Sequence, residues 1–191
     1  NETDIRARIA AYAPVRLSVD LAGLSSREKA ALAKLVAAVA AIDPIYWKQM
    51  GRAAIEAKAA FAGAADPIDR LYRDFIAINY GPFDVRDNDL RFVVGGGNGP
   101  RIPGAGYYPE DMTGEEFEAR LQAHPERRAE FEKPNTLIRR VDGILVAIPY
   151  ETIYEDDLEK ASRFLREAAE AIDHPGLRRY LSLRSEALLS G

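Results

Sequence analysis

The sequence predicts an α+β domain that is mostly α-helical and carries one small antiparallel sheet. Long stretches place apolar residues three and four positions apart, which is the period of a helix with one buried face. From about 136 to 150, two β-branched runs flank Asp142-Gly143, a dipeptide that readily supplies the positive φ angles of a hairpin turn. A chain of 191 residues without an internal repeat is long enough for a single domain, 1–191, with a full core.

The first quarter of the chain predicts a short helix, a strand and a long helix. Residues 3–12 have helical periodicity, and Pro14 ends that helix. Residues 15–19 alternate apolar and polar side chains, the period of a half-buried strand. Ser25 and Glu28 form a capping box, in which each side chain satisfies a backbone N–H of the other residue. The box predicts the start of a helix that runs to Ile42.

The remaining helices are indicated by their start signals. A helix is expected to restart at Asp43-Pro44 and to run to Phe61, with a break or bend near Gly51. Asp66-Pro67 combines a capping side chain with proline at the first helical position, and Thr113-x-x-Glu116 is a second capping box. Helices are therefore expected at 66–78, 113–121, 155–172 and 175–189.

The stretch from Ile78 to Met112 has neither the helical nor the strand period for most of its length, yet it is rich in aromatic residues. Long loops inside compact domains are usually functional or disordered, and disordered segments are poor in aromatics. We therefore expect an ordered loop. Each aromatic ring alone is readily explained as a core anchor, but together the rings predict a cleft for an extended peptide, with two polar contacts. The candidate binding residues are Asn79, Tyr80, Phe83, Asp84, Tyr107 and Tyr108.

Composition argues against several classes of function. The net charge is −4, and basic and acidic residues are mixed along the chain without a block of Lys or Arg. We therefore expect no nucleic-acid partner. The longest apolar run, residues 30–42, is too short for a bilayer span and contains Lys34. The chain has no cysteine, which excludes disulfides and thiolate ligands.

Several short strings occur in order over nearly the whole chain, from Tyr12 to Leu189. They are Tyr12-Ala13-Pro14-Val15-Arg16-Leu17 followed by Asp20-Leu21, Ile45-Tyr46-Trp47, Ile78-Asn79-Tyr80-Gly81-Pro82-Phe83-Asp84, Tyr108-Pro109-Glu110-Asp111-Met112-Thr113, Leu145-Val146-Ala147-Ile148-Pro149-Tyr150 and the final helix from Tyr180. In this order the strings resemble the N-terminal part of bacterial zinc peptidases of the dipeptidyl peptidase III family.

The resemblance implies the non-zinc, N-terminal part of a larger metallopeptidase. Members of the family are zinc exopeptidases that remove dipeptides from short peptides, and their metal is held by a His-Glu-x-x-Gly-His helix and a further glutamate. This chain stops at Gly191, before the region where the family places them. No catalytic residue is carried over, so we expect no activity from this chain alone. The expected partners are a peptide substrate and a C-terminal remainder that holds the zinc.

The residues themselves give little sign of a catalytic or metal site. His124 and His174 each precede a proline at a predicted helix boundary, where a cap or a solvated turn residue is the commoner role, so neither is taken as a metal ligand. The glycine-rich segment 95–106 lacks the Gly-Lys-Ser/Thr ending of a phosphate loop.

Two other functions remain open: a stand-alone helical module that binds a peptide or a protein, and a metal-free hydrolase that uses Asp84 and Asp111. If the chain is a fragment, we expect an apolar patch near the last helix and some self-association. The chain begins at Asn1 rather than methionine, so we expect that a leader, tag or disordered head was removed. An exported protein and a cytoplasmic one both fit.

Overall fold

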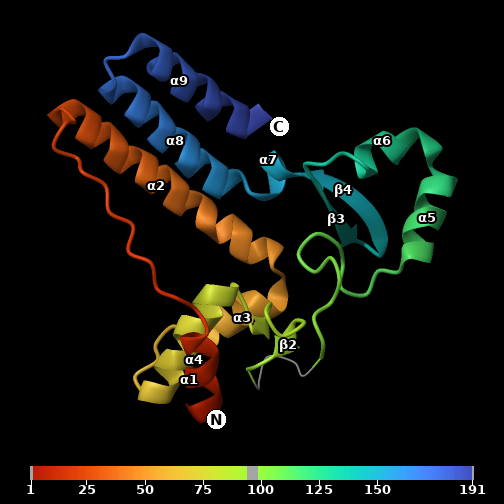
Figure 1. The fold of residues 1–191 in the computed structure, drawn as a ribbon. Helices are drawn as coiled ribbons and strands as arrows, with labels where there is room; N and C mark the ends of the chain where they lie inside the picture. The colour runs from red at the N-terminus through yellow and green to blue at the C-terminus, as the bar shows by residue number, and fades with distance from the viewer. Residues whose placement is uncertain (1, 94–98, 191) are drawn as a thin grey trace. The chain divides into compact units, whose positions relative to one another are not determined.

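The computed structural model describes residues 2–93 and 99–190, and it is mostly helical with two small antiparallel sheets (Figure 1). This confirms the predicted α+β class. The chain forms two compact units, each assembled from two segments. The first unit contains Asn1–Ser18 and Trp47–Glu110, and the second contains Val19–Tyr46 and Asp111–Gly191. The prediction of a single domain stays a prediction.

The first unit packs three helices and a two-stranded sheet around an aromatic core. Its elements are α1 (Glu2–Ala10), α3 (Arg52–Phe61), α4 (Pro67–Asn79), β1 (Phe83–Asp84) and β2 (Leu90–Arg91). As predicted, the Asp66 carboxylate accepts hydrogen bonds from the backbone N–H groups of Ile68 and Asp69 and so begins α4. Phe75 on that helix is fully buried, and its ring meets those of Tyr12 and Phe92 edge to face.

The second unit combines long helices with a β-hairpin. Its elements are most of α2 (Ser26–Gln49), α5 (Gly114–Ala123), η1 (Pro125–Arg127), α6 (Arg128–Phe131), β3 (Thr136–Val141), β4 (Ile144–Pro149), α7 (Tyr150–Ile153), α8 (Glu155–Ala171) and α9 (Pro175–Ser190). The hairpin pairs Val141 with Ile144, and the turn residues Asp142 and Gly143 have φ angles of 50° and 78°. The sequence predicted this turn correctly.

Helices α2, α8 and α9 share a core built largely of small side chains. Ala31, Ala168, Ala169 and Leu181 are buried together there. Helices α8 and α9 lie side by side (Figure 1), and the buried Ser162 hydroxyl donates to the Ser185 carbonyl at 2.8 Å. Small residues let helices approach closely, so this core leaves little room for a larger side chain.

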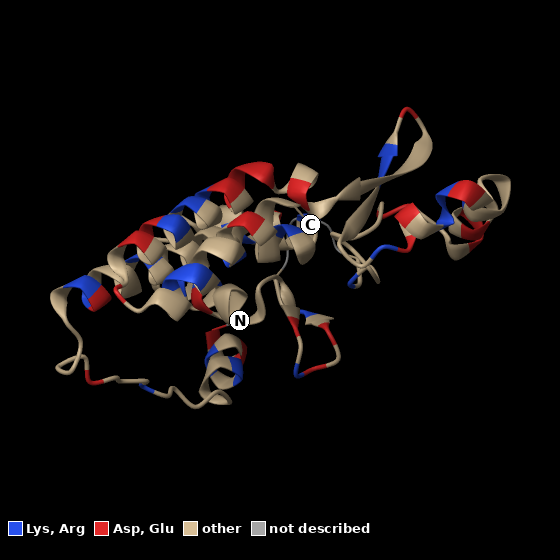
Figure 2. Cartoon of the chain, turned by 90° about the horizontal axis from the view of Figure 1, so that it is seen from above, with Lys and Arg blue, Asp and Glu red and all other residues tan. Residues whose placement is uncertain are grey.

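Charged side chains on the surface of the second unit form hydrogen bonds that cap helices and connect neighbouring elements. Basic and acidic residues alternate along the helices (Figure 2). The predicted capping box is present, because Ser25 N–H donates to Glu28 and Glu28 N–H donates to the Ser25 hydroxyl. Thr113 caps α5 by accepting a hydrogen bond from the N–H of Glu116 in the first turn. The Glu116 carboxylate in turn accepts from Arg140 of the hairpin at 2.6 Å. The Arg140 hydrogen bond lowers the pKa of Glu116.

Two local predictions are wrong. Residues 15–19 form no strand, and the side chains of Val15, Leu17 and Val19 are exposed, because no neighbouring strand pairs with this segment in the described parts of the chain. The helix does not restart at Pro44 either, since Pro44 lies inside α2, which continues to Gln49. The expected break occurs at Gly51, whose φ of 96° is unfavourable for other residues.

Helix α2 also passes a simple test for a membrane span. An 18-residue window of this 24-residue helix has a mean hydropathy of 1.5, and 22% of that window is buried. A single helix of this kind is weak evidence for a span, because the core helix of a soluble protein meets the same criterion.

The alanine core of the second unit should reject a larger side chain. Ala168→Leu adds three carbon atoms to a fully buried position, so we expect a loss of about 1–3 kcal/mol in the free energy of unfolding. The exposed Ala40→Leu on α2 is the matched control and should change stability little. Urea denaturation followed by circular dichroism measures both, and equal stabilities would show that this core is loosely packed.

Candidate functional site

The candidate site is organised by the short strand β1 in the first unit. Successive residues of a strand point to opposite faces. Asp84 enters a buried polar network, whereas Phe83 lines a cavity. The same two-residue strand therefore anchors the loop and contributes to the site.

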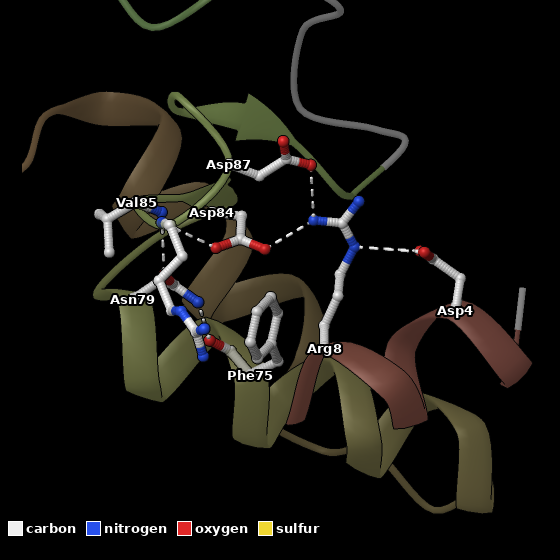
Figure 3. A network of polar contacts seen from close by, with 8 residues as sticks. Asp4, Arg8, Phe75, Asn79, Asp84, Val85 and Asp87 are labelled. Atoms are coloured by element: carbon white, nitrogen blue, oxygen red, sulfur yellow. Dashed lines mark hydrogen bonds and ion pairs between the residues drawn. The ribbon is translucent and has the colours of Figure 1, made fainter. Parts of the chain in front are cut away.

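The polar network joins α1 to the loop (Figure 3). Arg8 Nη1 donates to the Asp84 carboxylate at 2.6 Å and also lies 3.2 Å from Asp87, while its Nε pairs with Asp4. The Asp84 side chain is only 6% exposed, so this ion pair is largely removed from water. The hydrogen bond to Asp84 raises the pKa of Arg8. Arg8 and Asp84 lie 76 residues apart in the sequence, and their pairing fixes the start of the loop against α1.

Asn79 holds the other side of the same turn (Figure 3). Its amide donates to the Phe75 carbonyl at 3.0 Å, and its side-chain oxygen accepts from the Val85 N–H at 3.2 Å. The chain then turns through Tyr80, a left-handed residue with φ 50°, whose ring packs on Trp47 with centroids 4.9 Å apart. The polar and aromatic contacts together define one conformation for this turn.

The cavity beside Phe83 has a volume of about 150 Å³. Its charged lining consists of three arginines and two glutamates: Arg52, Arg91, Arg101, Glu56 and Glu110. Its remaining walls are Met50, Ala53, Phe83, Gly99, Pro100, Ile102 and Ala105. The cavity therefore joins an apolar surface to charged groups of both signs.

Each arginine of the cavity is held by a neighbouring group. Arg52 donates to Glu110 at 2.8 Å and lies 3.5 Å from Glu56. The Glu110 hydrogen bond raises the pKa of Arg52. The Arg91 guanidinium lies 4.7 Å from the Phe83 ring centroid, and Arg101 donates to Asp89 at 2.8 Å.

The loop approaches Gln49, at the end of α2, through a close backbone contact. Gly106 has φ 88°, and a Cβ atom there would lie 2.1 Å from the Gln49 carbonyl oxygen. Tyr107 follows directly, and its hydroxyl donates to the Gln49 side chain at 3.3 Å. Only glycine fits position 106, which explains why Gly106 is needed here.

The six predicted binding residues do not form one surface. Phe83 lines the cavity, Tyr80 belongs to the aromatic core, and Asn79 and Asp84 make the internal hydrogen bonds described above. Tyr107 and Tyr108 are 37% and 41% exposed. A role for the six residues in peptide binding stays a prediction.

Sequence reasoning did not identify the charged residues of the cavity. Arg52 begins α3, Arg91 lies on β2, and Arg101 follows a proline in the loop, so no local motif unites them. The only sequence signal for these residues was that arginines occur among the aromatic and glycine residues of the loop.

The two histidines have local roles. His124 Nδ1 lies 3.2 Å from Glu126, and His174 Nδ1 accepts from the Leu177 N–H at the start of α9. Among residues 2–93 and 99–190, no group of three or more histidine, aspartate or glutamate side chains is arranged to hold a metal ion. The described residues therefore do not fit a zinc site.

No family model matches the sequence. Two solved structures of dipeptidyl-peptidase III are similar to this chain. The structure from Caldithrix abyssi is 40% identical with a TM-score of 0.90, covering 96% of this chain and 34% of that chain. The structure from Corallococcus sp. strain EGB is 29% identical with a TM-score of 0.91, covering 99% and 35%. The resemblance expected from the sequence is confirmed.

A curated protein, Nudix hydrolase 3 of Arabidopsis thaliana, is 26% identical, and the match covers 94% of this chain and 30% of that protein. The chain thus spans about a third of the length of each of these relatives.

The Arg8–Asp84 pair should be the strongest polar contribution to the first unit. Arg8→Gln leaves a buried carboxylate without its main cation, so we expect a loss of about 3 kcal/mol in unfolding free energy. Asp84→Asn added to this variant should recover part of the loss, because the unpaired charge is removed. Chemical denaturation of the single and double variants measures the coupling.

Arg6→Gln is the matched control, because its pair with Glu2 on the same helix is exposed. It should cost less than about 0.5 kcal/mol. If Arg8→Gln costs no more than Arg6→Gln, the network does not hold the loop.

Proposed function

We propose that this chain supplies scaffold and cleft surface to a dipeptidyl peptidase III-like zinc peptidase, and that the metal belongs to the remainder of a longer protein. The observation that carries the proposal is the match of nearly the whole chain to about a third of two dipeptidyl-peptidase III structures. A TM-score of 0.90 at 40% identity supports a common fold.

The chemistry of the chain supports a non-catalytic role. Both histidines make contacts that belong to helix ends, and each carboxylate of the cavity is paired with Arg52. Carboxylates near helix N-termini, such as Glu155 and Asp156, are favoured there by the helix dipole and need no catalytic explanation.

Tyr107 and Tyr108 are the best candidates for a surface that contacts a peptide. Their rings are partly exposed at the end of the loop, while the loop backbone is fixed by hydrogen bonds from Tyr107 and Tyr108 N–H to the Gly104 carbonyl. Rigid, partly exposed tyrosines provide contact area at low entropic cost.

The purified 191-residue chain should not hydrolyse dipeptidyl chromogenic substrates, with or without added zinc, because no described group provides a metal site. A chimera in which this chain replaces the matching third of the Caldithrix abyssi protein should hydrolyse them, because the two share 40% of their residues and the same fold. Spectrophotometric release of the chromophore measures both.

The Caldithrix abyssi protein without the replaced third serves as the control and should be inactive or unfolded. Turnover by the 191-residue chain alone would overturn the non-catalytic role. A chimera that folds, binds zinc and remains inactive would contradict the scaffold function.

A stand-alone binding module is the second candidate, and an exposed apolar face on α9 favours it. Leu177, Tyr180 and Leu183 are 39%, 58% and 53% exposed and recur three residues apart. These residues are candidates for the apolar patch predicted near the last helix, which stays a prediction. Contiguous exposed apolar side chains commonly mark an interaction surface.

Through the α9 face we expect weak self-association of the isolated chain at high concentration. Leu183→Glu places a charge in this face and should lower the apparent mass measured by light scattering. Gln122→Glu, an exposed position on α5, adds the same charge elsewhere and should leave the mass unchanged. A clean monomer at every concentration would remove the evidence that this face associates.

A further inference from the structure

The segment that joins α1 to α2 exposes large apolar side chains at alternate positions. Residues 13–21 have no regular structure (Figure 1). Val15, Leu17 and Val19 are 76%, 91% and 77% exposed. The residues that alternate with them are polar: Arg16, Ser18 and Asp20. In a strand, successive side chains point to opposite faces, so this sequence would place its apolar residues on one face and its polar residues on the other.

The backbone of this segment has no hydrogen-bond partner from Val15 to Asp20 in the described parts of the chain. Both sheets of those parts are two-stranded and leave the segment out. Contacts resume at Ala22, whose N–H donates to the Asp20 carboxylate at 2.8 Å. A run of unpaired N–H and C=O groups is a template for pairing with another strand. The segment therefore has the sequence of a strand and lacks a neighbouring strand.

A covering surface for the apolar face has to come from another part of a protein. Large apolar side chains gathered on one face commonly mark a surface that another surface covers. The match to the two dipeptidyl-peptidase III structures covers 34% and 35% of their chains, so about two thirds of each has no counterpart here. A strand from such a remainder can cover the apolar side chains and also bond the backbone of the segment.

We propose that residues 15–19 add as a β-strand to the edge of a sheet in the zinc-bearing remainder of the longer protein. Strand addition supplies main-chain hydrogen bonds to the segment and turns Leu17 and its two apolar neighbours toward the core beneath that sheet. The proposal rests on the proposed scaffold function, because it names the surface through which the scaffold holds the remainder.

The polar face of the segment specifies the chemistry of the partner strand. Arg16 is exposed and has no ion pair among residues 2–93 and 99–190. Opposite charges on neighbouring strands attract each other, and like charges repel. The partner strand should therefore carry an acidic side chain beside Arg16, no acidic side chain beside Asp20, and apolar side chains on its other face.

Amide hydrogen exchange with residue-level mass spectrometry tests the pairing in two proteins, the isolated 191-residue chain and its chimera with the other two thirds of the Caldithrix abyssi protein. In the isolated chain, the amides of residues 15–19 should exchange at the rate of an unstructured peptide, because they donate to no acceptor. In the chimera, every second amide should exchange at least about tenfold more slowly, because an edge strand bonds its neighbour through alternate residues.

Leu17→Asp tests the apolar face by thermal unfolding. In the isolated chain this side chain is 91% exposed, so the melting temperature should change by less than about 2 °C. In the chimera the new charge enters the core beneath the sheet, so we expect the melting temperature to fall by about 4 °C or more. Ser18→Asp is the matched control, because it adds the same charge on the polar face, and it should leave both proteins unchanged.

The outcomes separate the strand pairing from the scaffold function. The pairing alone is overturned by an active chimera in which the amides of 15–19 exchange freely, or in which Leu17→Asp is tolerated as well as Ser18→Asp. A chimera that folds, binds zinc and protects these amides but hydrolyses nothing contradicts the scaffold function alone. Protection that grows with the concentration of the isolated chain identifies a second copy as the partner and overturns the proposal. A chimera that does not fold overturns both.

Discussion

The ion pair between Arg8 and Asp84 is the constraint on which the first unit depends. A carboxylate that is 6% exposed is costly to bury, and the guanidinium of Arg8 compensates for its lost hydration at 2.6 Å. The cation comes from α1, at the other end of the unit's sequence. Formation of the pair therefore requires α1 and the turn after α4 to be folded together, so a local charge contact specifies a long-range arrangement.

The strand period extends this constraint to the cavity. Because Asp84 is fixed in the polar network, the preceding Phe83 must point the other way, where its ring supports Arg91. At the far end of the loop, Gly106 fixes the chain against the Gln49 carbonyl. The cavity is thus bounded by two anchored ends. Asp84, which stabilises the loop, and Phe83, which lines the cavity, are neighbours in sequence but have different partners.

Local features of the fold could be predicted from the sequence, whereas long-range ones could not. The caps at Ser25 and Asp66 and the Asp142-Gly143 turn depend on residues within three positions, so their chemistry is readable directly. The alternation of apolar and polar residues at 15–19 led to a wrong prediction of a strand, because a strand also needs a neighbouring strand with which to pair. The role of the predicted binding residues stays a prediction. The arginines of the cavity were not predicted, since their positions depend on contacts such as Arg101–Asp89 and Arg52–Glu110 that no spacing rule encodes.

The buried cores and the charged lining of the cavity are separate sets of residues. Scaffold function requires only that the two units keep their cores, and those cores do not include the charged lining of the cavity. The lining residues are consequently open to selection for binding without loss of the fold.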